Sequence, residues 1–90
     1  MIIDTHCHLA SAQFDQSRRE AYVEHALREG IDRMITLGAR PDDWEANTAW
    51  ARQFPGVVFC ALGIHPDDAH DAPEGWADRL FRMAQDVPLA

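Results

Sequence analysis

Near its start the chain reads Ile2-Ile3-Asp4-Thr5-His6-Cys7-His8-Leu9, an apolar, β-branched run that leads into two histidines one residue apart. β-Branched residues favour strands, and successive side chains of a strand point to opposite faces of a sheet. His6 and His8 are therefore expected on one face, about 6.6 Å apart along the chain. After a small relaxation at the strand end, both imidazoles could bind one transition-metal ion.

Asp4 has the same parity as the two histidines and lies one step deeper in the predicted strand. A carboxylate there could accept a ring N–H and fix the tautomer of a metal-bound histidine. The alternative is that this His-x-His is only a half-buried polar pair. Its position favours the metal site, because the pair stands where an apolar strand gives way to a polar loop, and α/β folds build their sites there.

The rest of the chain alternates predicted helices and strands. Strands are expected over residues 31–37 and 57–64, and helices over about 17–29, 43–53 and from 73 onward. Ser17 and Glu20 fit a capping box that begins the first helix, and Gly30 fits the position after its end. Residues 86–90 are expected to begin a fourth strand. The third helix has an apolar stripe that we expect to be buried, made of Trp76, Leu80, Phe81 and Ala84.

Alternating strands and helices with short connections predict right-handed crossovers and a parallel sheet. Three such units fit either a small doubly wound sheet or part of a barrel. A parallel sheet needs both faces covered, and three strands alone leave open edges. We therefore predict an α/β fold, the N-terminal part of a (β/α)8 TIM-type barrel. Residues 1–90 would be the N-terminal portion of one barrel domain, truncated on its C-terminal side.

Composition narrows the possible classes of protein. The chain is 47% hydrophobic and 26% charged, which is typical of a globular protein, and its formal net charge is −7. That negative charge argues against a broad nucleic-acid-binding surface on this protein. Binding of one phosphate ester to metal ions in a single cleft is compatible with the negative charge. We find no apolar run of membrane-spanning length and no leader, so we expect no membrane association and a cytoplasmic location. Cys7 and Cys60 lie in apolar runs and are expected to be reduced packing residues.

His65 directly follows the third predicted strand, within Gly63-Ile64-His65-Pro66. Parallel strands end at the same edge of a sheet, so His65 is expected at the same edge as His6 and His8, which in a barrel is the catalytic face. The alternative is a histidine that holds a turn before Pro66. Two further histidines, His25 and His70, are expected in solvent.

The opening His-x-His strand, combined with the later Gly-x-His-Pro, resembles the TatD family of metal-dependent hydrolases, and the resemblance covers all 90 residues. It implies a complete barrel of about 250 residues. It also implies His6 and His8 as ligands of divalent metal ions (Mg, Mn or Zn), two ions in the complete protein, and His65 as a catalytic residue near the substrate. The substrate would be DNA or another phosphodiester, and no obligate protein partner is evident.

The chain departs from the family pattern because it lacks the glutamate after strand four, the two later histidines and the late aspartate that complete the metal site. We predict phosphodiester hydrolysis for a full-length parent and no activity for the 90 residues alone, since a catalytic zinc normally has three protein ligands. One alternative is another His-x-His barrel hydrolase acting on an amide, lactone or phosphomonoester. Another is a non-catalytic fragment with an incomplete metal site and exposed sheet edges.

Overall fold

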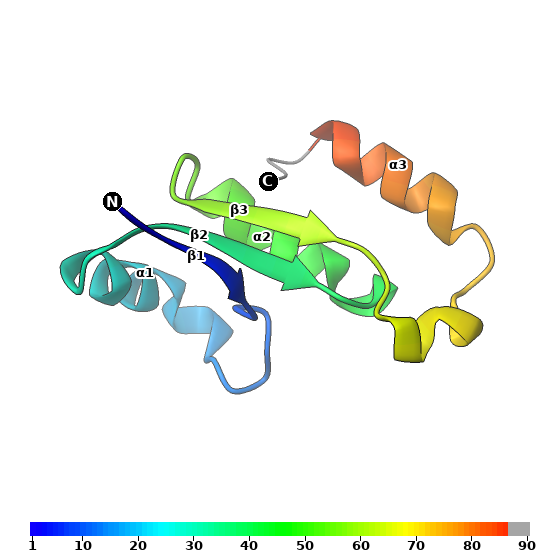
Figure 1. Cartoon of the computed structure of the whole chain (residues 1–90), viewed down its shortest axis with the longest axis horizontal. Coiled ribbons are helices and arrows are strands. Elements are labelled where there is room, and N and C mark those ends of the chain that lie inside the picture. The colour runs from blue at the N-terminus through cyan, green and yellow to red at the C-terminus, as the bar shows by residue number, and fades with distance from the viewer. Residues whose placement is uncertain (87–90) are drawn as a thin grey trace.

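A computed structural model describes residues 1–86 of the chain. Three strands alternate with three α-helices: β1 (Ile2–Cys7), α1 (Arg19–Arg28), β2 (Ile31–Gly38), α2 (Trp44–Gln53), β3 (Val58–Leu62) and α3 (Trp76–Asp86). A 3₁₀ turn precedes each helix: η1 (Gln16–Arg18), η2 (Pro41–Asp43) and η3 (Pro66–Asp71). The strands form one parallel sheet in the order β1-β2-β3, as Figure 1 shows. The predicted α/β order is confirmed.

The predicted fourth strand is not tested over most of its length. Residues 87–90 lie outside the described part of the chain. Asp86, which was expected to open that strand, is instead the last residue of α3.

Helices α1 and α2 cover the same face of the sheet. Val23 of α1 and Trp50 of α2 belong to one buried cluster with Met34 of β2 and Val58 of β3. Each is at most 4% exposed, and burying a side chain of this size contributes about 1.5–3 kcal/mol. Trp50 is thus a core residue.

The opposite face of the sheet is only partly covered. Along β2 and β3, fully buried residues alternate with half-buried ones, because successive side chains point to opposite faces. The half-buried positions pair across the two strands, Ile35 with Phe59 and Leu37 with Ala61. In a closed barrel this face is the interior, filled by side chains from all the strands.

The start of α1 differs from the prediction. Ser17 does not cap the helix: the Asp15 carboxylate accepts hydrogen bonds from the Ser17 backbone N–H over 3.0 Å and from its hydroxyl over 2.6 Å. These bonds stabilise a 3₁₀ turn, and α1 begins two residues later, at Arg19. The predicted end is confirmed, because Gly30 follows α1 with a φ of 98°, which favours glycine.

The apolar stripe predicted for the third helix is not buried. Phe81 is 67% exposed and Trp76 is 40% exposed. Within the described residues, α3 meets the rest of the molecule chiefly through Arg79, whose side chain donates to the Pro41 carbonyl over 2.8 Å and lies 5.2 Å from the centre of the Trp44 ring. The helix has the expected apolar pattern and begins at Trp76, three residues later than predicted, and within residues 1–86 no further layer covers its apolar side. None of the helices in residues 1–86 is long and apolar enough to cross a membrane.

Candidate metal site at the carboxyl edge of the sheet

The rings of His6 and His8 lie together at the end of β1. Their centroids are 5.1 Å apart, with an angle of 76° between the ring planes. Both residues are exposed. The intervening residue, Cys7, packs against the buried cluster on the helix side of the sheet. The two imidazoles are therefore directed away from the buried cluster, and His8 lies at the carboxyl edge of the sheet, where it lines a depression with Asp43 and Asn47.

The separation of the two rings fits one shared metal ion. The ring centroids, 5.1 Å apart, are close enough for both imidazoles to turn toward one ion, and the same distance and angle are those of an ordinary edge-to-face ring pair. Two imidazoles form part of a site only, because residues 1–86 contain no cluster of three or more His, Cys, Asp or Glu side chains that could hold a metal ion.

Asp4 does not have the predicted contact with a histidine ring. Its Oδ1 accepts the backbone N–H of His6 over 3.0 Å. The pairing of β1 with β2 is irregular here, since three steps along β1 from Asp4 to Cys7 match two steps along β2 from Met34 to Thr36. This shift in register interrupts the regular alternation of side chains along β1 between Asp4 and Cys7. Parity counted from Asp4 through a regular strand therefore does not apply to the two histidines.

A chain of buried hydrogen bonds from β2 and α2 holds the loop that begins at His8. The Thr36 hydroxyl accepts the Leu9 backbone N–H over 3.0 Å and donates to Asn47 Oδ1 over 2.6 Å. Asn47 Nδ2 in turn donates to the Asp43 carbonyl over 2.9 Å. Thr36 and Asn47 are at most 1% exposed, so these bonds are shielded from competing water.

A second tie comes from Gln16. Its side-chain amide donates to the Leu9 carbonyl over 2.9 Å, and its Oε1 accepts from Nε1 of the buried Trp50 over 2.7 Å. Phe14 packs on Tyr22 and against the core. The segment after the two histidines is thus held to both α1 and α2.

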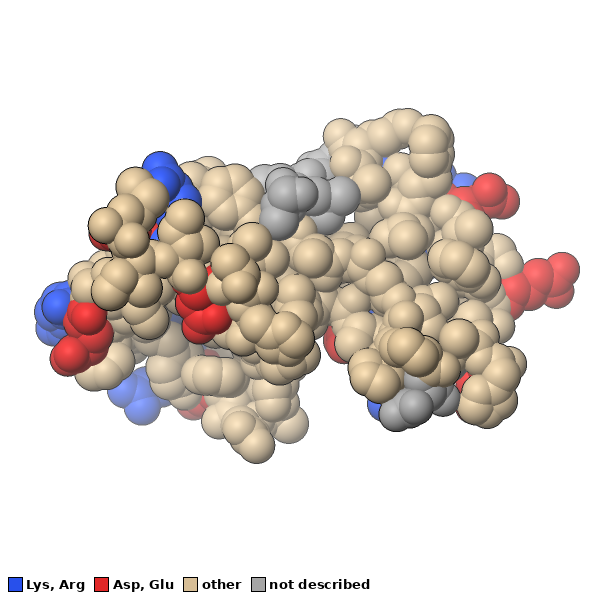
Figure 2. Space-filling model, in the orientation of Figure 1, with Lys and Arg blue, Asp and Glu red and all other residues tan. Residues whose placement is uncertain are grey.

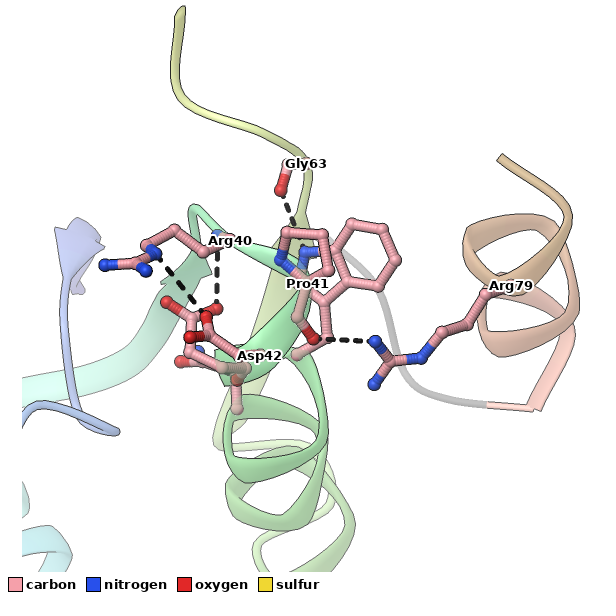
Figure 3. A network of polar contacts seen from close by, with 8 residues as sticks. Arg40, Pro41, Asp42, Gly63 and Arg79 are labelled. Atoms are coloured by element: carbon pink, nitrogen blue, oxygen red, sulfur yellow. Dashed lines mark hydrogen bonds and ion pairs between the residues drawn. The ribbon is translucent and has the colours of Figure 1, made fainter. Parts of the chain in front are cut away.

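His65 follows β3 at the same edge of the sheet, as predicted, and its side chain is exposed. Its backbone N–H donates to the Ala39 carbonyl over 2.7 Å, and Gly63 N–H donates to the Gly38 carbonyl over 2.8 Å. These bonds extend the ladder between β2 and β3 beyond the strands. Trp44 Nε1 adds a bond of 2.8 Å to the Gly63 carbonyl, which is drawn in Figure 3.

His65 is separated from the metal pair. It belongs to the strand two places away from β1, a lateral distance of roughly 10 Å for neighbours about 4.8 Å apart. It forms no metal-binding cluster with His6 and His8 among the described residues.

A shallow depression of about 230 Å³ is lined by His8 and by Asp43, the first residue of the helix predicted over 43–53. Burial raises the pKa of the Asp43 carboxyl, while hydrogen bonds from the backbone N–H groups of Arg40 and Ala39 oppose that shift. The sequence does place Asp43 near the candidate site, because Asp43 comes five residues after β2 ends at the carboxyl edge of the sheet. No motif distinguished it from an ordinary helix-start acid.

The cysteines are free thiols, and Cys60 is buried. Cys7 is half-buried, and its Sγ lies 3.4 Å from the Ile35 carbonyl. Burial, with a smaller effect from the Asp4 carboxylate, raises the pKa of Cys7 to about 11. A thiol with this pKa is a poor nucleophile near neutral pH, which argues against a reactive role beside the histidines.

The two histidines expected in solvent are exposed. His25 lies on the outer side of α1. His70 pairs with Asp71 over 3.2 Å, and both side chains are more than three-quarters exposed.

Parallel βα units with paired imidazoles at their carboxyl edge place the chain among the barrel proteins whose sites lie at that edge. The model of the family described as TatD related DNase matches residues 3–89. The chain belongs to this family, and its fold is the N-terminal part of a (β/α)8 barrel.

Individual relatives agree with this assignment. The chain is 29% identical over 85 residues to the 3'-5' ssDNA/RNA exonuclease TatD of Cronobacter turicensis, which covers 94% of the chain and 32% of that protein. It is 30% identical over 74 residues to the uncharacterized metal-dependent hydrolase YabD of Bacillus subtilis, covering 82% of the chain and 28% of that protein. A putative deoxyribonuclease of Danio rerio, tatdn3, is 27% identical over 64 residues, which is 71% of the chain and 24% of that protein. The chain spans about a third of the length of the first of these relatives.

Proposed function

We propose that this chain is the N-terminal portion of a single barrel domain that hydrolyses phosphodiester bonds of single-stranded nucleic acid with the help of divalent metal ions. The observation that carries the proposal is the pairing of the His6 and His8 rings at 5.1 Å. Family membership and the printed activity of the Cronobacter relative support the substrate class.

His6 and His8 would hold one divalent ion, Mg, Mn or Zn. Such an ion, when bound, supplies Lewis-acid stabilisation of a phosphoryl oxygen and lowers the pKa of a bound water. The chain's own contribution is to position the ligands: β1 ends with both rings at the carboxyl edge of the sheet, and the Thr36–Asn47 pair fixes the backbone that follows them. The second ion proposed for a complete protein would need ligands beyond this chain.

His65 is proposed to act on the substrate, through a phosphate oxygen or a water. Its exposed side chain stands on a backbone that is tied to β2 by the Ala39 carbonyl, which supports a fixed position at the site edge. Because two imidazoles are fewer than the three protein ligands of a catalytic zinc, the 90 residues alone are expected to be inactive. The cytoplasmic location also stays a prediction.

Calorimetric titration of the chain with Mn²⁺ tests the metal assignment. We expect one ion per chain, with binding lost in His6→Ala and in His8→Ala and unchanged in His25→Ala, a matched removal of an exposed imidazole. Circular dichroism establishes that each variant remains folded. Equal Mn²⁺ affinity in all three variants would contradict the proposal.

A further inference from the structure

We infer that Arg40 binds a phosphate of the nucleic-acid strand next to the metal-binding histidines, an inference that rests on the proposed function and deepens it. All eight basic residues of the chain are arginines, and Arg40 is the one basic residue within residues 8–16, 39–43 and 63–75, the segments that follow the three strands. In the loops at the carboxyl edge of the sheet, Arg40 is therefore the one arginine beside the candidate metal site.

The backbone of Arg40 is fixed between the two parts of the site. The preceding residue, Ala39, accepts the His65 backbone N–H over 2.7 Å. The backbone N–H of Arg40 donates to Asp43 Oδ1 over 3.4 Å, and Asp43 lines the depression that also contains His8. Arg40 thus lies between the surroundings of His8 and those of His65.

The side chain of Arg40 is available to a ligand. It is 59% exposed, and its Nε forms an ion pair of 3.5 Å with Asp42, which is itself 72% exposed. An ion pair this exposed is weak. In Figure 3 the guanidinium extends away from α2 and α3, on the opposite side from Arg79. A guanidinium has five N–H donors in a planar fork, which suits bidentate binding of phosphate.

Other arginines are engaged or placed differently. Arg79 donates to the Pro41 carbonyl and lies over the Trp44 ring, while Arg19 lies over the Trp50 ring. Arg28 and Arg52 lie in the last turns of α1 and α2, which return the chain to the amino edge of the sheet. Figure 2 shows blue side chains mainly at the α1 end of the visible face, next to red ones, and no broad basic patch on that face. A single phosphate contact is therefore the form of recognition that this surface supports.

A second depression, of about 350 Å³, is lined by residues 40–42 and 71–73, so Arg40 itself borders it. Asp42 and Asp71 line it, and their carboxylates oppose a phosphate there. A nucleic-acid strand that runs from the His8 depression along the carboxyl edge of the sheet would place a phosphate at Arg40. The next nucleoside, which is uncharged, would then lie near Asp42 and Asp71.

Fluorescence anisotropy of the full chain with a labelled ten-nucleotide oligothymidylate, measured in EDTA and in Mn²⁺ at several salt concentrations, tests this inference. We expect Arg40→Ala to weaken binding about tenfold and to reduce the salt slope by about 0.7, the value for one phosphate of a single strand. Arg40→Lys keeps the slope and loses part of the affinity. Arg28→Ala, the same charge change at the amino edge, changes affinity less than twofold. With an uncharged methylphosphonate oligomer the difference between Arg40→Ala and the wild type disappears.

Equal dissociation constants for Arg40→Ala and Arg28→Ala would overturn the assignment of Arg40, and so would an absence of oligonucleotide binding by the wild-type chain. Neither outcome affects the Mn²⁺ titration, which reads the His6–His8 site directly. If Mn²⁺ does not bind while oligonucleotide binding still depends on Arg40, the proposed metal chemistry is contradicted and the assignment of Arg40 is not.

Discussion

The hydroxyl of Thr36 donates to Oδ1 of Asn47 over 2.6 Å, inside a sheet–helix interface where neither side chain is more than 1% exposed. The same hydroxyl oxygen accepts the Leu9 backbone N–H, one residue after His8. One buried polar pair therefore joins β2 to α2 and also holds the loop that carries a candidate metal ligand.

Replacing Thr36 with valine tests this connection. The variant keeps the shape of the side chain but leaves the Leu9 N–H and Asn47 Oδ1 without their partner, so we expect a loss of about 1–3 kcal/mol in the free energy of unfolding. Urea denaturation measures the loss. Thr5→Val, the same change at an exposed position of β1, is expected to stay within about 0.5 kcal/mol. Equal effects of the two substitutions would show that the buried pair contributes nothing specific.

Gly38 ends β2 where three side chains leave no room for a methyl group. A Cβ there would lie 2.9 Å from Leu62 Cδ2, 3.1 Å from Trp44 Cδ1 and 3.3 Å from Asp43 Oδ1. We expect Gly38→Ala to reduce the melting temperature, with a cost of about 1–3 kcal/mol from overpacking. Gly63→Ala is the matched control, because a Cβ at Gly63 meets nothing within 4 Å. A Gly38→Ala variant as stable as Gly63→Ala would contradict this packing at the strand end.

The Cys7 thiol gives a prediction about pH. Its pKa is raised from 9.0 to about 11, so folding favours the protonated thiol. The unfolded chain loses this proton first as the pH rises. The contribution of Cys7 to stability is therefore fully present below about pH 9 and is lost as the pH rises toward about 11.

The rate at which iodoacetamide alkylates Cys7, in a Cys60→Ser background, measures the raised pKa of the Cys7 thiol. At pH 8 we expect the folded chain to react about a hundredfold more slowly than the same chain in urea, since the difference of about two pKa units lowers the thiolate fraction by that factor. Similar rates in the two states would mean that Cys7 is not protected as described.

The sequence was sufficient for the order of elements and for the position of both histidine sites along the chain. Apolar runs and glycine stops determined β2, α2 and β3 to within about two residues, because their buried stripes have clear periods. The same reasoning was wrong at Ser17, whose backbone N–H and hydroxyl both donate to the Asp15 carboxylate, and at Asp4, where a shift in strand register interrupts the alternation of side chains. Such a shift depends on pairing with a second strand, which a local pattern does not contain.

Burial of α3 was also predicted wrongly, for a different reason. Trp76 and Phe81 have the spacing of a buried stripe, but burial requires a surface to pack against, and in the described residues α3 contacts its neighbours mainly through Arg79. Periodicity predicts which side of a helix is apolar and does not supply the layer that covers it. The role proposed for Arg40 had no signal in any motif, since the proposal rests on the place of Arg40 between two strand ends.

The central claim is that His6 and His8 together form a divalent-metal site. It is tested most directly by NMR spectra of the imidazole nitrogens of all five histidines during titration with Zn²⁺. We predict large shifts of one ring nitrogen in each of His6 and His8, reached at one equivalent of metal, while His25 and His70 do not change. Shifts distributed over all five rings, or confined to residues other than His6 and His8, would contradict the account.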